Sequence, residues 1–498
     1  MSDGHAALDR LKMYVGGEWV EPAQGDYLET VDPFTARPWA LVPRGSAADA
    51  DRAVKAAHKA FKEGPWGRMH PSERARILYR FGELIEANAD ALAATEVRDN
   101  GRLLAEMRHQ IRYIPNWYRY YAGLADKIEG VVHPCDKPAL SFSRPEPLGV
   151  CVGIVPWNAP LLLLSLKAAP ALAAGNTIII KPAEHTSASA LQLMTLVEDA
   201  GFPPGVFNVV TGFGKEIGEP LVTHPLVRHV GFTGSTATGA HLYSLAARDV
   251  KRVSLELGGK SPNIVFADAD LDNAVRGVVG GIFGATGQTC IAGSRLLVQR
   301  SVHDRFLEKL IDFTRKARVG DPTNLETQIG PIANRMQYDK VLGYIDIAVS
   351  EGAELLYGGC RPELAECRDG FFIQPTIFSG VRNDMRIARE EVFGPVLSTI
   401  PFDDPEEAVA IANDSEFGLA AGVWTSDMQL AIRMSERLEA GSVWINTYRD
   451  ISYTTPFGGY KKSGIGRENG VEGIREYLQT KAVWISTASE VPNPFVIG

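Results

Sequence analysis

The chain contains few cysteines, and they follow no metal-binding pattern. Cys135, Cys151, Cys290, Cys360 and Cys367 are scattered, odd in number and without a CxxC pair. This spacing excludes the common zinc motifs and a disulfide framework, and it is typical of free thiols in a reducing compartment. We therefore expect a cytoplasmic protein with no metal site.

Clusters of positive charge are also missing. The formal net charge is −9, and no basic stripe with interleaved aromatic residues is present. Proteins that bind nucleic acids neutralise phosphates with clustered lysine and arginine. We therefore expect no nucleic-acid partner.

Long uninterrupted hydrophobic runs are absent as well. Residues 1–17 mix charged and apolar side chains, so we expect no secretory signal. Residues 147–166 carry no formal charge and have the length of a membrane span, but they include Pro147, Pro156 and Pro160. Proline breaks helices, so a strand, a turn and a helix start fit better, and we expect no membrane partner.

What the chain does have is the size and composition of a soluble globular protein with several units. It holds 498 residues, 45% hydrophobic and 22% charged, which is more than one hydrophobic core accommodates. Residues 50–62, 72–97 and 103–125 carry apolar side chains at helical spacing, which predicts three helices.

From residue 150 onward, short apolar runs alternate with helical segments. The runs are 150–155, 177–180, 206–210, 229–232 and 264–266, and the helical segments are 161–174, 188–200 and 236–247. Buried strands that alternate with helices predict a parallel sheet covered on both faces, in a doubly wound Rossmann-like fold.

A second alternation follows, which predicts a second α/β domain. Its strands are 296–298, 396–400, 421–423 and 442–445, and its helices are 304–318, 336–351, 405–412 and 428–438. We expect residues 1–130 and 149–257 to form the Rossmann-like domain and 258–465 the second domain. The β-rich pieces 131–148 and 477–491 form a small appendage.

Two segments carry a nucleophile and a candidate base. Glu256 ends an apolar strand beside a glycine pair, and Cys290 follows Gly287, Gln288 and Thr289 in a loop of small residues. If thiol and carboxylate meet in the fold, they provide a nucleophile and a general base. The alternative for Cys290 is an inert buried thiol.

The turn after the first strand offers an oxyanion donor. Pro156 and Pro160 restrict the backbone around Asn158. A rigidly held amide that donates to a developing oxyanion lowers a barrier by roughly 3 kcal/mol. The alternative is an asparagine that satisfies backbone groups of the turn.

Two further turns suit a dinucleotide. Lys181 and Glu184 follow a buried strand, and a carboxylate there accepts a bond from a ribose 2′-OH and repels a 2′-phosphate, which favours NAD over NADP. Gly234, Ser235 and Gly239 join a strand to a helix N-terminus suited to a phosphate. The alternatives are a solvated ion pair and an ordinary capped turn.

Seven motifs in order carry a family resemblance over nearly the whole chain. They are PWNAP, KPAE, FTGSTATG, LELGGKSPNIV, GQTC, EEVFGPV and PFGGYKKSG. Together they resemble the aldehyde dehydrogenase superfamily. The resemblance implies that Cys290 is the nucleophile, Glu256 the general base and Asn158 part of the oxyanion hole, with Lys167 and Glu468 in a supporting proton relay.

The same resemblance implies a reaction and two sets of contacts. An aldehyde is oxidised to an acid through a cysteine thiohemiacetal and thioester, with hydride transfer to NAD and then hydrolysis. The cofactor contacts fall on Val155, Pro156, Trp157, Lys181, Ala183, Glu184, Gly214, Phe232, Thr233, Gly234, Ser235, Leu257, Gly258, Gln337, Lys340, Glu391 and Phe393. The substrate pocket is lined by Tyr113, Trp117, Leu163, Leu166, Thr289, Ile291, Tyr448, Arg449 and Phe457.

The side chains of this pocket favour an apolar or aromatic aldehyde, and Ala159 widens it where many relatives carry an aromatic residue. Arg449 leaves an alternative open: pointing inward it would select a semialdehyde through its carboxylate, whereas outward it is a solvated loop charge, the orientation we expect. A CoA-acylating enzyme and a non-catalytic member of the fold are further alternatives, disfavoured because both Glu256 and Cys290 are present. Segments 131–148 and 477–491 match the family's oligomerisation strands, which implies a homodimer or homotetramer.

Overall fold

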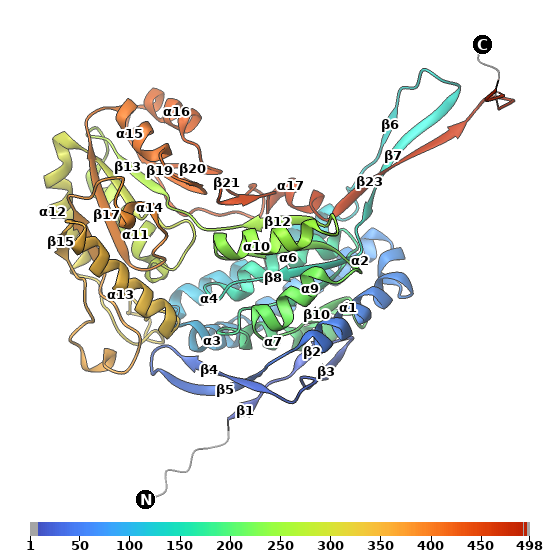
Figure 1. Cartoon of the computed structure of the whole chain (residues 1–498), viewed down its shortest axis with the longest axis horizontal. Coiled ribbons are helices and arrows are strands. Elements are labelled where there is room, and N and C mark those ends of the chain that lie inside the picture. The colour runs from blue at the N-terminus through green and yellow to red at the C-terminus, as the bar shows by residue number, and fades with distance from the viewer. Residues whose placement is uncertain (1–7, 492, 496–498) are drawn as a thin grey trace, which may run out of the picture.

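The computed structural model describes residues 8–491 and 493–495. Two α/β lobes lie side by side, and a ribbon of strands projects from one of them (Figure 1). The first seven residues of the predicted segment 1–130 lie outside the described residues.

The first lobe contains an eight-stranded sheet in the order β22-β12-β11-β8-β9-β10-β2-β3. Its strands are β2 (Met13–Val15), β3 (Glu18–Val20), β8 (Val150–Ile154), β9 (Thr177–Lys181), β10 (Phe207–Val209), β11 (Val227–Thr233), β12 (Arg252–Glu256) and β22 (Gly464–Ile465). The five central strands, β12 to β10, are parallel, which confirms the Rossmann-like prediction. At the edges of this sheet β2, β3 and β22 add antiparallel strands, which the sequence analysis did not foresee.

Both faces of this sheet are buried, which explains the unbroken apolar runs. In β9, Ile178 and Ile180 pack into one core and Ile179 into another. The first core lies under α2 (Pro71–Ala87), α3 (Ala89–Asn100), α4 (Leu104–Tyr113), α5 (Pro115–Leu124), α6 (Pro160–Ala173), α7 (Ala188–Leu193) and α8 (Val197–Ala200). The second lies under α1 (Ala47–Lys62), α9 (Glu219–Thr223) and α10 (Thr236–Ala247), with a π-helical turn at Gly214–Gly218.

Three long helices of the prediction are divided. The helix expected over 72–97 breaks at Asn88, whose side chain donates to Leu84 O at 2.8 Å. The one expected over 103–125 breaks before Pro115, because proline disfavours helical geometry in the residue before it. The one expected over 188–200 is interrupted by a 3₁₀ turn, Met194–Leu196.

The second lobe contains a seven-stranded sheet in the order β15-β16-β17-β14-β13-β19-β20. The strands are β13 (Pro262–Val265), β14 (Arg295–Gln299), β15 (Glu354–Tyr357), β16 (Thr376–Ser379), β17 (Val396–Phe402), β19 (Ala420–Trp424) and β20 (Ser442–Ile445). The helices are α11 (Leu271–Phe283), α12 (His303–Thr314), α13 (Arg335–Ser350), α14 (Arg386–Arg389), α15 (Pro405–Asn413) and α16 (Met428–Arg437). The last helix of the chain's described part, α17 (Gly470–Arg475), instead contacts α6 and buries Ile474 in the core of the first lobe. The predicted strands and helices of the second lobe are present, but the sequence reasoning missed β15, β16, the short α14 and α11, which is rich in glycine.

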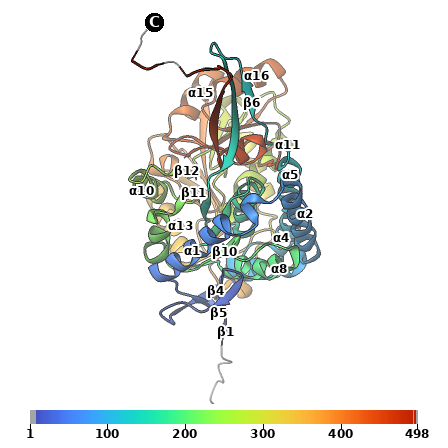
Figure 2. The same ribbon diagram turned by 90° about the vertical axis from the view of Figure 1, so that its right-hand side faces the viewer.

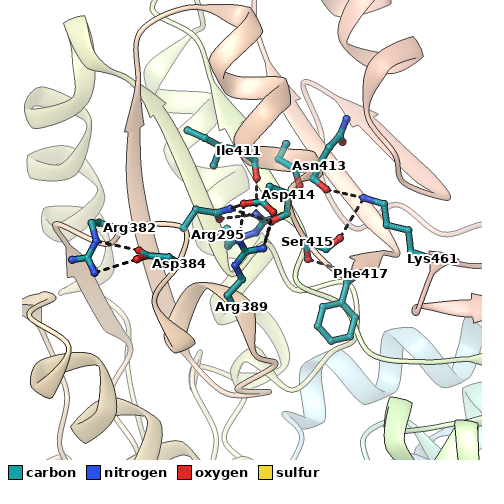
Figure 3. A network of polar contacts seen from close by, with 12 residues as sticks. Arg295, Arg382, Asp384, Arg389, Ile411, Asn413, Asp414, Ser415, Phe417 and Lys461 are labelled. Atoms are coloured by element: carbon teal, nitrogen blue, oxygen red, sulfur yellow. Dashed lines mark hydrogen bonds and ion pairs between the residues drawn. The ribbon is translucent and has the colours of Figure 1, made fainter.

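A buried arginine ties this sheet to its neighbouring loops (Figure 3). Arg295 on β14 donates to the backbone oxygens of Lys260 and Ile411, both at 2.9 Å. Lys461 donates to Asn413 O at 2.7 Å from the other side. The strand that follows the cysteine loop is thereby fixed to the backbone that follows Glu256.

The predicted appendage is a separate three-stranded sheet, β23-β7-β6, formed by β6 (Val131–His133), β7 (Ala139–Pro147) and β23 (Leu478–Ser486). A second small sheet, β1-β5-β4, lies at the opposite end of the molecule (Figure 2), and it consists of β1 (Asp9–Arg10), β4 (Tyr27–Asp32) and β5 (Arg37–Pro43). A two-stranded pair joins β18 (Phe417–Gly418) to β21 (Tyr460–Lys461). Within the described residues, no helix combines the length and apolar character that a membrane crossing requires.

Candidate active site

All predicted cofactor residues line one cavity of about 470 Å³. It lies at the carboxyl ends of the parallel strands, where β8 leads to Val155, β9 ends at Lys181, β11 ends at Thr233 and β12 leads to Leu257. Open α/β sheets bind ligands at this edge. Asn158, Leu163 and Cys290 line the same cavity.

Lys181 and Glu184 form an ion pair at 3.2 Å on the cavity wall. Burial acts to raise the pKa of Glu184, but Lys181 holds it below its usual range, so the carboxylate is charged. A fixed negative charge faces any ligand that reaches this end of the cavity.

The turn between β11 and α10 is both a capped helix start and a wall of the cavity. Ser235 Oγ accepts from Thr238 N at 3.3 Å. A Cβ on Gly239 would lie 2.3 Å from Leu257, so this glycine lets α10 pack closely on the strand. The two interpretations of this turn, a helix cap and a ligand wall, are therefore compatible.

The segment Glu390–Val396 closes the other side of the cavity. Gln337 on α13 donates to the backbone oxygens of Val392 and Phe393, both at 2.9 Å. The Phe393 ring lies edge-on to Trp157 with centroids 5.2 Å apart. Glu391 accepts from Gly259 N at 2.9 Å, and burial raises the pKa of its carboxyl.

The loop before the thiol has an unusual backbone. Ala285 and Thr286 have φ of 56° and 54°, in the left-handed region that costs a non-glycine residue roughly 1–3 kcal/mol. Gly287 follows at φ 69°, and a Cβ there would lie 2.1 Å from Gly394 O. The GQTC motif needs its glycine because it packs against the backbone of EEVFGPV.

Cys290 is partly exposed at the cavity wall and packs beside Ile291 and Phe457. Burial raises the pKa of its thiol to about 12, and Glu391 and Glu256 add to the shift. The resting thiol is therefore neutral, and it needs a base or a positive charge before it acts as a nucleophile.

Asn158 is buried and reaches toward the thiol loop. Its Nδ2 donates to Gln288 O at 2.9 Å, two residues before Cys290. An amide nitrogen carries two hydrogens, so the second remains for another acceptor in the cavity.

Glu256 lies at the end of β12, behind the cavity, and is not one of its lining residues among those described. Both of its carboxyl oxygens are buried without a hydrogen-bond partner in the described part of the chain. Burial raises the pKa of Glu256 well above its usual range, and Glu468 raises it further.

Lys167 and Glu468 lie beside Glu256 and form a buried ion pair at 2.5 Å. Lys167 Nζ also donates to Thr233 Oγ1 at 2.7 Å, on the strand next to Glu256. The predicted relay residues therefore do meet around the predicted base.

The predicted substrate residues form two groups. Thr289, Ile291, Tyr448 and Phe457 surround or adjoin Cys290, whereas Tyr113 and Trp117 form an aromatic cluster with Tyr453. Leu163 lines the cavity and Leu166 is buried in the core of the first lobe.

Arg449 is partly buried, which differs from the solvated loop charge that we expected. Its Nη1 donates to Gly280 O at 2.9 Å and would lie only 2.0 Å from a Cβ on Gly284. Burial lowers the pKa of its guanidinium, while nearby Glu106 acts in the opposite direction.

Sequence reasoning missed several residues at these sites. His185, Thr238 and Met336 also line the cavity, and Trp444 and Leu419 pack around Cys290. His185 directly follows the KPAE motif and Met336 directly precedes Gln337, so adjacency to a named residue was the available signal. Trp444 and Leu419 carry no such signal, because strands β19 and β20 bring them in from a distance.

Comparison with known proteins decides the family. The model of the aldehyde dehydrogenase family matches residues 19–483. The chain belongs to the aldehyde dehydrogenase family. A hydroxyisobutyraldehyde dehydrogenase of Mycolicibacterium austroafricanum is 47% identical over 474 residues, which cover 95% of this chain and 93% of that protein. The putative aldehyde dehydrogenase DhaS of Bacillus subtilis is 42% identical and covers 95% of each chain.

Solved structures of aldehyde dehydrogenases share the whole fold. Betaine aldehyde dehydrogenase of Staphylococcus aureus in complex with NAD+ superposes with a TM-score of 0.96, at 39% identity over 98% of this chain and 97% of that one. An NAD-dependent aldehyde dehydrogenase of Sinorhizobium meliloti gives 0.95 at 43% identity, with the same coverage of 98% and 97%. This chain is thus an aldehyde-oxidising enzyme whose structural neighbours bind NAD+.

Proposed function

We propose that this aldehyde dehydrogenase oxidises its aldehyde through a thioester on Cys290 and uses NAD. The observation that carries the proposal is the shared cavity, which brings Cys290 and Asn158 together with the dinucleotide-type residues of the Rossmann-like sheet. A nucleophile, an oxyanion donor and a cofactor cavity in one place are the parts this reaction requires.

The cavity fits NAD in its charge. The carboxylate of Glu184 suits a ribose 2′-OH and repels a 2′-phosphate, and Lys181 holds that carboxylate in place. Ser235 and the N-terminus of α10 suit the pyrophosphate. Glu391, Gln337 and Phe393 line the opposite side of the cavity. When bound, NAD supplies the hydride acceptor of the reaction.

The first step forms a bond between Cys290 Sγ and the aldehyde carbon. The thiol must lose its proton first, because its raised pKa keeps it neutral at rest. The free hydrogen of the Asn158 amide then stabilises the developing oxyanion of the thiohemiacetal. Oxidation of this adduct leaves a thioester on Cys290.

Hydrolysis is the task of Glu256. Its carboxylate takes a proton from water, the oxygen attacks the thioester, the C–S bond breaks, and the acid leaves while Cys290 regains its thiolate. Because Glu256 rests behind the cavity beside Lys167 and Glu468, its side chain must turn toward the thiol to act. The neighbouring ion pair offers a path for the proton it accepts.

We infer an apolar or aromatic aldehyde as the substrate. Apolar side chains surround Cys290, and Ala159 leaves room where a larger side chain would narrow the approach. Arg449 leaves the alternative open, a semialdehyde whose carboxylate pairs with its guanidinium, because its side chain is partly buried rather than fully solvated.

Three further assignments complete the proposal. Residues 1–130 and 149–257 form the NAD-binding domain, and residues 258–465 form the catalytic domain. The three-stranded sheet β23-β7-β6, called the arm below, joins copies of the chain into a homodimer or homotetramer, because its strands expose Val132 and Trp484. The five unpaired cysteines, all in the described part of the chain, favour the cytoplasm.

Replacing Cys290 by alanine tests the function. Aliphatic, aromatic and carboxylate-bearing aldehydes are offered with NAD, and NADH absorbance is followed with and without CoA. We expect the wild type to make NADH and free acid, and Cys290→Ala to lose turnover while NAD still binds in calorimetry. Normal turnover of that variant would overturn the proposal, and an acyl-CoA product would replace hydrolysis by acylation of CoA.

A further inference from the structure

We propose that Glu106 is a positioning residue. It acts through Arg102 to hold the oxyanion donor Asn158 at a fixed position relative to the thiol loop, residues 285–290. The inference rests on the proposed function and adds a residue to it. Glu106 lies on α4, outside the motifs that carry the family resemblance.

The first half of the evidence connects Glu106 to Asn158. Arg102 is buried just before α4, and its Nη1 donates to the backbone oxygen of Asn158 at 3.2 Å. Its Nε donates to Glu106 Oε2 at 3.0 Å, and its Nη2 forms an ion pair with the same oxygen at 2.9 Å. The Arg102 guanidinium therefore joins the backbone of Asn158 to a carboxylate on helix α4.

The second half connects Glu106 to the thiol loop. Glu106 Oε1 accepts from the backbone N–H of Ala285 at 3.2 Å. Ala285 O accepts from Gln288 N at 3.0 Å, and Gln288 O accepts from the Asn158 side chain at 2.9 Å. Together these contacts form a closed ring of hydrogen bonds. It runs from the backbone oxygen of Asn158 through Arg102, Glu106, Ala285 and Gln288 to the side-chain amide of Asn158.

Charge makes this ring stronger than a set of neutral bonds. Burial acts to raise the pKa of Glu106, but Arg102 and Arg449 hold it below its usual range, so the group is a carboxylate. Charge-assisted hydrogen bonds are roughly twice as strong as neutral ones. The hydrogen bond from Ala285 N to Glu106 also stabilises a residue in the left-handed region of backbone conformation, which is unfavourable for alanine.

The ring explains how the Asn158 amide is kept in place. One hydrogen of Nδ2 is engaged by Gln288 O, so the amide plane is set by the thiol loop itself. The position of that loop relative to the Asn158 backbone is set by Arg102 and Glu106. A misplacement of about 1 Å at a reacting centre can cost 10²-fold in rate, so the ring controls the oxyanion contact.

Glu106→Ala tests the assignment, with Glu106→Gln as the milder variant because its carbonyl oxygen can still accept from Ala285 N. The matched control is Glu83→Gln, which removes an exposed carboxylate paired with Arg80 at 3.3 Å. We expect Glu106→Ala to lower kcat and kcat/KM equally, by about tenfold to 10²-fold, with an intermediate effect for glutamine. KM, NAD affinity and the control's kinetics stay at wild-type values.

A double-mutant cycle separates positioning from a general structural role. In an Asn158→Ala background, the added Glu106→Ala substitution should cost no further rate in single-turnover NADH formation, because the ring then has no amide to place. Two results would overturn the assignment. One is a rate loss in the double variant equal to the product of the two single losses, and the other is a kcat of Glu106→Ala equal to that of the wild type. Both results leave the proposed function intact, since that depends on wild-type turnover and its loss in Cys290→Ala.

Discussion

Lys167 and Glu468 form an ion pair inside the protein although 301 positions separate them in the chain. The pair lies beside Glu256, and the charge of Glu468 joins burial in raising the pKa of the Glu256 carboxyl. If the Glu256 side chain turned toward the thiol and away from Glu468, the repulsion that raises its pKa would be relieved.

Replacing Glu256 by glutamine should slow the hydrolysis of the thioester. We expect kcat to fall by about 10²-fold or more, since general bases contribute 10²–10⁴-fold. Rapid mixing should show a burst of NADH followed by a slow steady state. A burst of normal rate means that Glu256 does not take the thiol proton, and a slowed burst means that it does. Unchanged burst and steady-state rates would remove Glu256 as the base.

The same variant has a pH-dependent effect on stability. The folded-state pKa of Glu256 is raised, so the folded protein holds this proton more tightly than the unfolded chain. The stabilisation that results from this tighter proton binding is fully present below the pKa of Glu256 in the unfolded chain. It is lost as pH rises through the pKa of Glu256 in the folded protein. Melting temperatures of Glu256→Gln should therefore fall less than those of the wild type as pH rises above the usual pKa range of a glutamate carboxyl. Parallel curves would show that the carboxyl is not buried as described.

Glu184→Ala should weaken discrimination between cofactors. The substitution removes the charge that repels a 2′-phosphate and frees Lys181, whose partner it is at 3.2 Å. We expect kcat/KM for NADP to rise about tenfold, which corresponds to about 1.4 kcal/mol. Glu184→Asp, which keeps the charge, serves as the control and should retain the preference for NAD. An unchanged ratio in the alanine variant would place the discrimination elsewhere.

Arg449→Ala distinguishes the two substrate classes. Because the guanidinium already donates to Gly280 O and faces the charge of Glu106, we expect similar, small changes of KM for neutral and carboxylate-bearing aldehydes. Arg449→Lys, which keeps the positive charge, is the comparison. A large rise of KM confined to the acidic aldehydes, absent in the lysine variant, would support a semialdehyde dehydrogenase.

Placing charge on the arm should dissociate the assembly. Val132 and Trp484 are 68% and 59% exposed, and Val131, Leu140 and Ile485 of the same sheet are exposed as well, so apolar side chains are concentrated there as at an interaction surface. We expect Val132→Lys with Trp484→Lys to shift the mass measured by light scattering to a smaller species. Thr480→Ala, an exposed polar position on the same ribbon, should not. A monomeric wild type would contradict the proposed role of the arm.

Much of the fold was predictable because periodicity is a local property. Thr236–Ala247 was expected as a helix and is one with the same bounds, since Ser235 caps it and Gly239 packs it on Leu257. Gly277 illustrates the opposite case. Glycine argues against a helix, yet α11 passes through it, because a Cβ there would lie 1.9 Å from Trp424. A glycine that the packing against Trp424 requires thus lowered the helix propensity of the segment, so the sequence did not indicate a helix there.

The sequence by itself determined the family resemblance and the candidate catalytic groups. Motif order and residue type pointed to Cys290, Glu256 and Asn158, and to the residues that now line one cavity. Only the tertiary structure decided how these groups are held: Glu256 next to Lys167 and Glu468, and Asn158 linked through Arg102 to Glu106. Those contacts join elements far apart in the chain, and their strength comes from burial, which excludes water from charged groups. A linear pattern records neither the distance between two segments nor the solvent removed when they meet.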